Sequence, residues 1–198
     1  MSRFEWQKVE TAYQELRPSD HAEELRWIVN QETILDRRTG ITVTRGTIRH
    51  PGICVVVPFL DSDHILLMHQ YRYAAAQALW EVPAGTISGR LEKGRVLPVE
   101  TPEFCARREL VEETGYEARK LEKVCECYAM PGTSDELMHV FFAYQLIQRE
   151  PSRDLGEVIE ELRSFPLAEI AGMIDRGEIH DAKTLVGLFH ALRRAFNQ

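Results

Sequence analysis

The sequence predicts an α/β (α+β) protein in which a mixed β-sheet is sandwiched between helices. Two observations carry this prediction. Short apolar runs rich in β-branched residues recur between residues 41 and 146, separated by turn residues, which is typical of strands. One helical pattern interrupts them at residues 102–114, and two more follow from residue 166 onward. Strands gathered around one helix and closed by further helices favour a sheet that is covered on both faces.

The first forty residues are polar and allow two interpretations. Glu5–Leu16 and His21–Val29 each fit a helix, but Trp27–Leu35 equally fits a strand. Ile41–Ile48 carries β-branched residues and predicts a strand. We therefore expect residues 1–50 to form a small N-terminal β-rich region, and residues 51–198 to form the main domain.

The main domain is expected to contain six strands and three helices. Asp61-Ser62-Asp63 is a turn signal, so the strands on either side of it are predicted to form a hairpin. The expected strands are Gly52–Leu60, His64–Gln70, Leu79–Val82, Leu121–Tyr128, Leu137–Leu146 and Glu160–Phe165. Two amphipathic helices are expected at Pro166–Arg176 and Asp181–Phe196.

The remaining helix carries an unusual group of carboxylates. Thr101 followed by Pro102 predicts its start, and Gly115 predicts a left-handed stop. Glu109, Glu112 and Glu113 stand at positions i, i+3 and i+4, so they share one face near the C-terminal end. The helix dipole disfavours negative charge there. A divalent cation that prefers oxygen ligands is the simplest compensation, although Glu-Glu pairs on helices usually face solvent.

The overall composition excludes several classes of protein. A net charge of −7 argues against a general nucleic-acid surface, and no apolar run approaches the length of a membrane span. The four cysteines have neither zinc-site spacing nor a disulfide framework. The first residues also lack the apolar core of a signal peptide. We therefore expect a cytoplasmic protein with no nucleic-acid or membrane partner.

The residues before the helix complete a long motif. Gly94, five residues, Glu100, seven residues and then residues 108–116 (RELVEETGY) fill every fixed position of the Nudix box. The chain therefore resembles a Nudix hydrolase, and the resemblance implies the Nudix fold.

Further motifs resemble the ADP-ribose pyrophosphatase branch of that family, over roughly residues 40–190. The most telling are a Gln-Tyr-Arg run and a Trp-Glu-x-Pro-Ala-Gly run. The matching segments are His50-Pro51-Gly52, Gln70-Tyr71-Arg72-Tyr73, Leu79–Gly85, Met130-Pro131-Gly132 and Asp181-Ala182-Lys183-Thr184. This branch also implies a homodimer, in which N-terminal strands of one subunit help to shape the adenine pocket of the other.

One departure from the branch concerns the glycine that opens the box. In the branch it is the glycine of Pro-Ala-Gly, yet Gly85 precedes Glu100 by fifteen residues instead of six. Either Gly94 is the box glycine, or Gly85 is and about nine residues are inserted. We favour Gly85, because the alanine carbonyl of this turn typically ligates metal. Residues 89–98 are then an extra loop, either a solvated excursion or a basic lip over the substrate phosphates.

The resemblance implies roles for the acids around the box. Glu109 and Glu113 would ligate Mg²⁺ (or Mn²⁺) together with the carbonyl of Ala84. Glu112 would be a further ligand or the acceptor of a hydrogen bond from Arg108, which would orient the glutamates. Carboxylates suit both metals, which prefer oxygen ligands.

A general base and substrate-binding groups are expected outside the box. Glu157 aligns best with the base of the branch; Asp154 and Glu160 are alternatives, and an ordinary acidic surface loop is nearly as good an interpretation. Arg72 fits a phosphate clamp, since guanidinium offers a planar fork to phosphate oxygens. Glu81 would accept from an adenine amine or a ribose hydroxyl. Gly85 and Gly132 complete the predicted substrate site.

The predicted activity is hydrolysis of the pyrophosphate of ADP-ribose, or a related nucleoside diphosphate sugar, to a nucleoside monophosphate and a sugar phosphate. Two alternatives stay open. One is a Nudix hydrolase of another sugar nucleotide or a dinucleotide. The other is a Nudix-fold module that binds ADP-ribose without turnover, although such modules usually lose box acids that this chain keeps.

Overall fold

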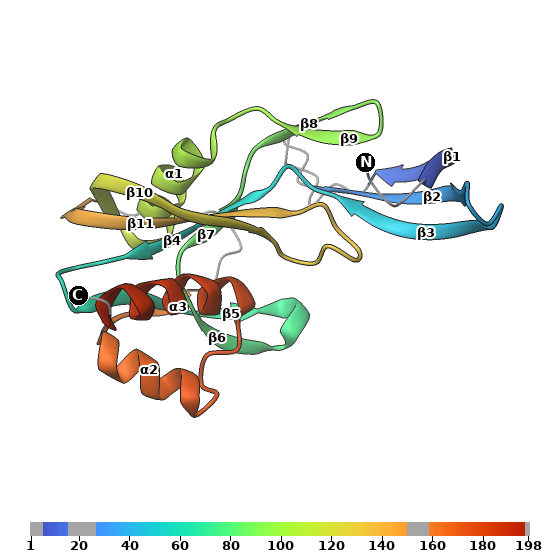
Figure 1. Cartoon of the computed structure of the whole chain (residues 1–198). Helices are drawn as coiled ribbons and strands as arrows, with labels where there is room; N and C mark the ends of the chain where they lie inside the picture. Colours follow the sequence, from blue (N-terminus) through green and yellow to red (C-terminus); the bar gives the residue numbers. More distant parts are fainter. Residues whose placement is uncertain (1–5, 16–26, 150–158, 197–198) are drawn as a thin grey trace. The chain divides into compact units, whose positions relative to one another are not determined.

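The computed structural model describes residues 6–15, 27–149 and 159–196, which form two compact units (Figure 1). The first unit contains the described residues up to Gly52 together with residues 87–100 and 128–137. The second contains residues 53–86, 101–127 and the described residues from 138 onward. The chain therefore crosses between the units several times.

The first unit is built on a three-stranded antiparallel sheet of β1 (Trp6–Glu15), β2 (Ile28–Asp36) and β3 (Thr42–Arg49), in that order. The helix predicted at Glu5–Leu16 is therefore wrong. Nine of the ten residues of β1 find a partner in register on β2, and this pairing overrides a weak helical pattern. The strand predicted at Trp27–Leu35 is confirmed as β2, whereas the competing helix falls partly outside the described residues.

The residues inserted before Glu100 form a β-hairpin rather than the expected loop. Its strands are β8 (Gly89–Glu92) and β9 (Arg95–Pro98). Lys93 and Gly94 close it with φ angles of 49° and 74°, as a two-residue hairpin turn requires. The Asn30 side chain donates to the Gly94 carbonyl at 3.1 Å, and Val96 packs on Ile28 of β2. The hairpin is thus joined to the N-terminal sheet within the first unit.

The second unit contains a four-stranded mixed sheet in the order β10 (Tyr116–Tyr128), β11 (Leu137–Gln148), β4 (Ile53–Pro58) and β7 (Ala84–Thr86). β11 runs parallel to β4, and β7 runs antiparallel to it. Figure 1 shows α1 (Pro102–Thr114) on one face of this sheet and α3 (Ala182–Phe196) on the other. The predicted sandwich of a mixed sheet between helices is confirmed.

A second sheet of three strands completes this unit, in the order β12 (Ile159–Pro166), β5 (His64–Arg72) and β6 (Gln77–Glu81). A short 3-10 helix, η1 (Tyr73–Ala75), links β5 to β6, and α2 (Leu167–Asp175) follows β12. The helices predicted at Pro166–Arg176 and Asp181–Phe196 are confirmed within a residue or two.

The hairpin predicted across Asp61-Ser62-Asp63 is wrong, because β4 and β5 belong to different sheets. Only one bridge, between Phe59 and Ile65, joins the two segments, with a hydrogen bond from Leu60 N–H to the His64 carbonyl at 2.9 Å. Both edges of β4 are already paired, by β11 and by β7. The turn therefore reverses the chain without extending the ladder.

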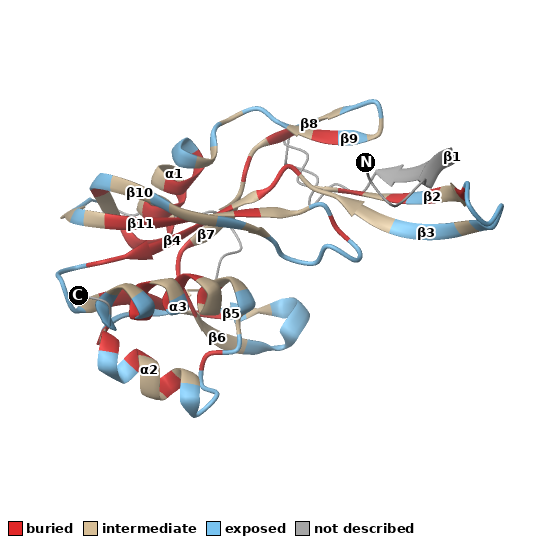
Figure 2. Ribbon diagram, viewed as in Figure 1, coloured by how far each residue is buried: buried red, intermediate tan, exposed pale blue. Residues whose placement is uncertain are grey.

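β4 forms the centre of the core. Cys54 to Val57 are completely buried, as expected for a strand covered on both faces. Figure 2 shows buried residues gathered on β4 and on the sides of α1 and α3 nearest to it. α3 comes so close that a Cβ on Gly187 would lie 2.7 Å from a methyl group of Val57. Within the described residues, no helix is long and apolar enough to cross a bilayer.

Candidate active site

Helix α1 has the ends that the sequence predicts. The Thr101 hydroxyl accepts from Phe104 N–H at 3.2 Å, and Pro102 occupies the first helical position. Gly115 adopts a φ of 73°, and its N–H donates to the Val111 carbonyl at 2.8 Å. The last turn contains no basic residue to offset the dipole.

The Pro-Ala-Gly segment, whose last two residues begin β7, packs directly against the carboxylates of α1. Ala84 N–H donates to Glu113 Oε2 at 2.9 Å, and Glu113 is only 1% exposed. A Cβ placed on Gly85 would lie 1.9 Å from Glu109 Cδ, so only glycine permits this approach. The structure therefore brings Ala84, Gly85, Glu109 and Glu113 together. Gly94 lies instead in the turn of the β8–β9 hairpin.

Arg108 pairs with two of the helix carboxylates. Its Nη1 lies 2.8 Å from Glu109 Oε1 and 2.8 Å from Glu112 Oε2. Glu112 therefore accepts a hydrogen bond from Arg108, which is one of the two roles expected for it. Arg108 holds both side chains toward one another and supplies one positive charge to three neighbouring glutamates.

The donor set fits a divalent cation that prefers oxygen ligands. Glu109 and Glu113 are buried carboxylates beside a third acid, and buried like charges need compensation. In the described part of the chain, no three His, Cys, Asp or Glu side chains already converge on one point. Mg²⁺ retains several waters and often uses only one or two carboxylates, so this arrangement suits it.

A second cluster of charges surrounds Glu81, which is completely buried. Arg72 grips both of its oxygens, with Nε at 2.8 Å and Nη2 at 2.6 Å. Lys183 Nζ lies 2.5 Å from Glu81 Oε2 and 2.9 Å from Asp181 Oδ1. The hydrogen bond to Glu81 raises the pKa of Arg72, and the negative charges of Glu113 and Asp181 act in the same direction. Arg72 therefore lies within the electric field of Glu113.

The start of α3 fixes this cluster in place. Asp181 accepts from the backbone N–H of Thr184 at 2.9 Å and from its hydroxyl at 2.6 Å. The same hydroxyl accepts from Val82 N–H at 3.0 Å. The sequence identified Asp181–Thr184 only as a motif of the branch. The Asp-x-x-Thr spacing is a local capping signal, but nothing local indicated that Lys183 reaches Glu81 across 102 residues.

The predicted general base lies outside the described residues, since Glu157 and Asp154 both fall within 150–158. The alternative, Glu160, is described: its carboxylate lies 3.0 Å from His69 Nδ1 and its side chain is 47% exposed. The His69 ring packs on Trp80 at 4.7 Å, and Trp80 packs edge-on against Phe165 at 4.9 Å. Trp80 is thus used in packing.

Gly132 belongs to the first unit, in the loop between β10 and β11. No atom lies within 4 Å of a Cβ built on Gly132, so a larger side chain would meet no steric clash there. The loop lines a cleft of about 290 Å³ with Arg49 and Asp135. Arg49 binds both oxygens of buried Glu32 at 2.7 and 2.8 Å, and reaches Asp135 at 3.1 Å.

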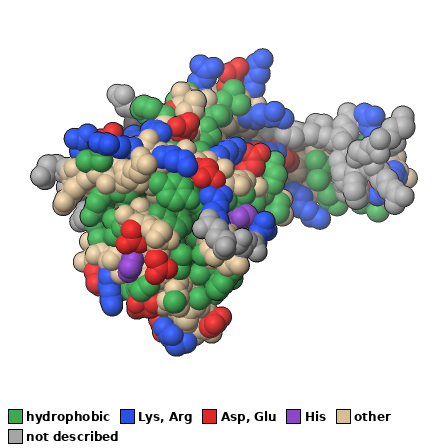
Figure 3. Space-filling view, turned by 60° about the vertical axis from the view of Figure 1, so that its left-hand side comes forward, with side chains coloured by type: hydrophobic (Ala, Val, Ile, Leu, Met, Phe, Trp, Pro, Cys, Tyr) green, Lys and Arg blue, Asp and Glu red, His purple; other side chains and the backbone are tan. Residues whose placement is uncertain are grey.

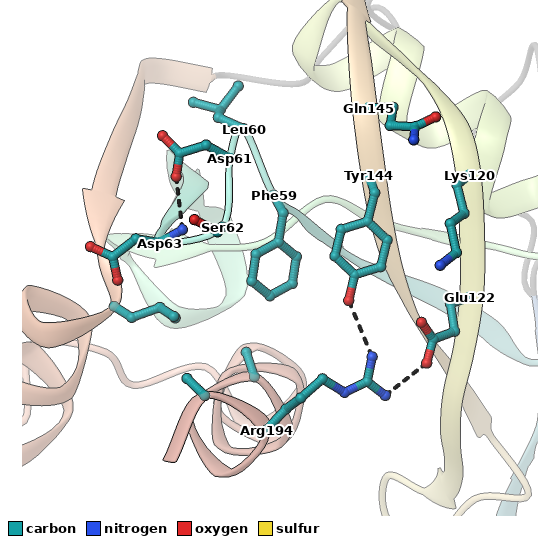
Figure 4. A pocket seen from close by; sticks show the side chains of 13 residues that line it. Phe59, Leu60, Asp61, Ser62, Asp63, Lys120, Glu122, Tyr144, Gln145 and Arg194 are labelled. Carbon is teal, nitrogen blue, oxygen red and sulfur yellow. Dashed lines mark hydrogen bonds and ion pairs between the residues drawn. The ribbon is translucent and has the colours of Figure 1, made fainter. Parts of the chain in front are cut away.

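A separate cleft of about 830 Å³ lies in the second unit, between the β4–β5 turn, β10, β11 and the end of α3 (Figure 4). Arg194 donates to the Tyr144 hydroxyl at 3.1 Å and pairs with Glu122 at 2.7 Å, which lowers the pKa of Glu122. Val55 of β4 pairs with Ala84, whereas Phe59 lines this cleft four residues further along.

The surface seen in one view carries charges of both signs (Figure 3). On the face drawn in Figure 3, basic and acidic side chains are interspersed, and no extended basic patch appears.

The mixed sheet between helices, with a carboxylate-bearing helix packed on a Pro-Ala-Gly turn, defines a fold whose site is suited to a divalent cation and a phosphate. The chain belongs to the NUDIX domain family, whose match covers residues 48–186. The expected resemblance is confirmed.

Three comparisons illustrate the relationship. The chain is 38% identical over 141 residues to the ADP-ribose pyrophosphatase of Bacillus subtilis, covering 71% of each protein. It is 32% identical over 142 residues to the GDP-mannose pyrophosphatase of Citrobacter koseri, covering 70% of this chain and 71% of that one. A crystal structure of an ADP compounds hydrolase superposes with a TM-score of 0.76 and 18% identity, covering 100% of this chain and 97% of the other. At that identity the superposition shows the fold alone.

Proposed function

We propose that the protein hydrolyses the pyrophosphate of ADP-ribose or a related nucleoside diphosphate sugar to a nucleoside monophosphate and a sugar phosphate. The packing of the Ala84-Gly85 turn against Glu109 and Glu113 carries this proposal, because it gathers oxygen donors at a buried point beside Arg72. The likeness to an ADP-ribose pyrophosphatase supports the choice of substrate.

In this proposal Glu109, Glu113 and the Ala84 carbonyl hold Mg²⁺ or Mn²⁺, and Glu112 either joins them or stays with Arg108. A bound Mg²⁺ or Mn²⁺ would neutralise charge on the phosphate oxygens and would orient the attacking water. Arg108 keeps Glu109 and Glu112 in place through its two contacts at 2.8 Å.

The remaining assignments concern proton transfer and substrate. Glu157 is the proposed general base, with Asp154 and Glu160 as alternatives. Arg72 binds a phosphate, because its guanidinium is the more exposed partner of Glu81. Glu81 acts through Arg72, since its own carboxylate is buried and fully engaged. Gly85 is the proposed backbone contact to the substrate, and the substrate role of Gly132 stays a prediction from the sequence.

A substrate panel tests the proposal. The protein is incubated with Mg²⁺ and ADP-ribose, GDP-mannose, UDP-glucose or a dinucleotide, and monophosphate release is followed by chromatography. We expect turnover of at least one sugar nucleotide and none after chelation of the metal. Lack of turnover throughout the panel, with Mg²⁺ and with Mn²⁺, would contradict the proposed activity.

The alternative substrate has its own support, since a GDP-mannose pyrophosphatase is also similar to this chain. Preference for GDP-mannose over ADP-ribose in the panel would favour it. Binding of ADP-ribose without release of AMP would favour the non-catalytic module instead.

Two further proposals concern assembly and location. We propose a homodimer in which residues 1–50 take part as a dimerisation element beside a domain of residues 51–198; light scattering of the full chain and of an Arg45→Glu variant on β3 tests it.

We also propose a cytoplasmic location. Cys54 and Cys105 support it, because their sulfurs lie 3.1 Å apart as free thiols, as a reducing compartment allows.

A further inference from the structure

The cluster around Glu81 places two cations on one buried carboxylate. Arg72 holds both oxygens of Glu81 through its Nε and Nη2, and Lys183 holds Oε2 a second time. Lys183 also pairs with Asp181 at 2.9 Å, so the cluster contains two cations and two carboxylates, and Arg72 alone would balance the charge of Glu81. Holding Lys183 against Glu81 as a second cation costs the conformational entropy of a long side chain. A role for Lys183 beyond charge pairing would account for this cost.

The members of the cluster differ in their exposure to solvent. The Glu81 side chain is 1% exposed and that of Lys183 is 16% exposed, whereas that of Arg72 is 38% exposed. Among the described residues, Nη1 of Arg72 has no hydrogen-bond partner. Arg72 is therefore the member that reaches an incoming anion.

Recruiting Arg72 to a ligand raises an electrostatic problem. If its guanidinium turned onto a phosphate and left Glu81, the buried carboxylate would lose its fork of two hydrogen bonds. An unpaired buried charge is strongly destabilising. Lys183 keeps the Glu81 carboxylate paired, because its ammonium forms ion pairs with both Glu81 and Asp181.

We propose that Lys183 is a positioning residue, which keeps buried Glu81 paired while Arg72 shifts its guanidinium onto a substrate phosphate. This inference rests on the proposed function, since it takes a phosphoanhydride as the ligand of that site. Asp181 fixes Lys183, and the bond from Val82 N–H to Thr184 fixes the start of α3 beside β6. Lys183 therefore stays as a partner of Glu81, through Oε2, when Arg72 leaves.

Three variants test this role: Lys183→Met, Lys183→Arg and, as a matched control, Lys123→Met. Lys123 is an exposed lysine of the same unit that pairs with Glu126. Binding of inorganic pyrophosphate is measured by calorimetry without metal, and kcat and KM are measured for the sugar nucleotide that the wild type hydrolyses best. We expect pyrophosphate affinity to fall at least about tenfold in Lys183→Met, with a matching rise in KM. Lys183→Arg should recover most of it, and Lys123→Met should behave like the wild type.

A double variant separates this role from a merely structural one. In Glu81→Gln/Lys183→Met, the buried group is neutral, so Arg72 can leave it without a charge penalty. Pyrophosphate affinity should then exceed that of Lys183→Met by several-fold. If Lys183→Met does not fold, Lys183→Gln replaces it with the same expectations.

Several outcomes would overturn the inference. These are unchanged pyrophosphate affinity in Lys183→Met, a double variant no better than the single one, or a wild type that binds no pyrophosphate. A loss of kcat with unchanged KM would also contradict it. Lys183-dependent binding of pyrophosphate without turnover of any sugar nucleotide would instead refute the proposed activity and leave the positioning role supported.

Discussion

Glu81 in the second unit and Glu32 in the first are both buried glutamates on β-strands that bind an arginine through both carboxylate oxygens. The ion pairs around them are arranged differently, and Lys183 beside Glu81 also pairs with a second acid, Asp181. Glu81 is shared by two cations, Arg72 and Lys183, whereas Arg49 is shared by two carboxylates, Glu32 and Asp135. Arg49 is held by two acids, whereas in the proposal above Lys183 stays paired with Glu81 when Arg72 shifts onto a ligand.

This contrast suggests how the two units divide their work. The cluster of the first unit ties β2 and β3 to the loop that carries Asp135. The cluster of the second unit lies within the field of Glu113, and in the proposal above it keeps Arg72 available for a ligand. The predictions below test whether the first cluster serves stability and the second serves catalysis.

The largest effect is expected from Glu113→Gln. The amide oxygen can still accept from Ala84 N–H, so folding should be preserved, but the negative charge offered to the metal is lost. We expect kcat/KM for the best substrate to fall by about a hundred- to a thousandfold, with an unchanged Tm. Glu103→Gln, an exposed acid of the same helix, is the control. Wild-type turnover by Glu113→Gln would contradict the metal assignment.

The comparison itself is tested by Arg49→Met and Arg72→Met. Removing Arg49 deprives two acids of their shared cation, so we expect a loss of about 3 kcal/mol in the free energy of unfolding. Removing Arg72 leaves Lys183 on Glu81, so its loss of stability should be clearly smaller, while KM rises. Urea unfolding and steady-state kinetics measure both quantities. Equal losses of stability would remove the distinction between the two clusters.

A smaller loss of activity is expected from Gly85→Ala. The added methyl group must displace the Glu109 carboxylate, which lies within 2 Å of it. A misplaced ligand should reduce kcat/KM by up to about a hundredfold with little change in Tm. Gly172→Ala on α2 is the matched control, because its methyl group meets only the tip of the exposed Arg176 side chain. Unchanged activity in Gly85→Ala would argue against Gly85 as the box glycine.

The smallest effect concerns pH and the first unit. Burial lowers the pKa of His50 from 6.5 to about 4, and Gly52 N–H donates to its Nδ1 at 3.0 Å, which requires a neutral ring. The unfolded chain binds a proton near pH 6.5 and the folded one does not, so stability is lost as the pH falls from 6.5 toward 4. We expect a loss of about 1.5 kcal/mol between pH 6.5 and 5 from this group.

His50→Gln isolates that contribution, because the amide can accept from Gly52 N–H without titrating. Unfolding free energies at pH 6.5 and 5 should differ less in this variant than in the wild type, whereas the exposed His180→Gln should leave the difference unchanged. If the unfolding free energy of His50→Gln changes between pH 6.5 and 5 as much as that of the wild type, groups other than His50 produce the pH dependence.

The features that could be predicted from the sequence are those set by neighbouring residues. The ends of α1 followed from Thr101, Pro102 and Gly115, because capping acts within one turn of helix. The sandwich of helices around a mixed sheet followed from the order of the elements. The choice of Gly85 over Gly94 agrees with the contact between Gly85 and Glu109.

The features that could not be predicted depend on distant pairing. β1 adopts a strand because β2 is available to pair with it, and β4 and β5 separate because β11 occupies one edge of β4. Arg72 and Glu81 were both expected at the substrate, yet they bind each other. No spacing in the sequence indicates that Lys183 joins them, since only the folded chain brings α3 to β6.

The hydrogen bond from Val82 N–H to Thr184 spans 102 residues, and so does the contact between Lys183 and Glu81. Contacts of such separation must close a long loop, and they form slowly relative to local structure. During synthesis α1, with its glutamates, emerges well before residues 181–184 do. A nascent chain can therefore contain the whole Nudix box before Lys183, which contacts Glu81, has been synthesised. We expect the chain to become able to bind substrate only when the last helix has formed.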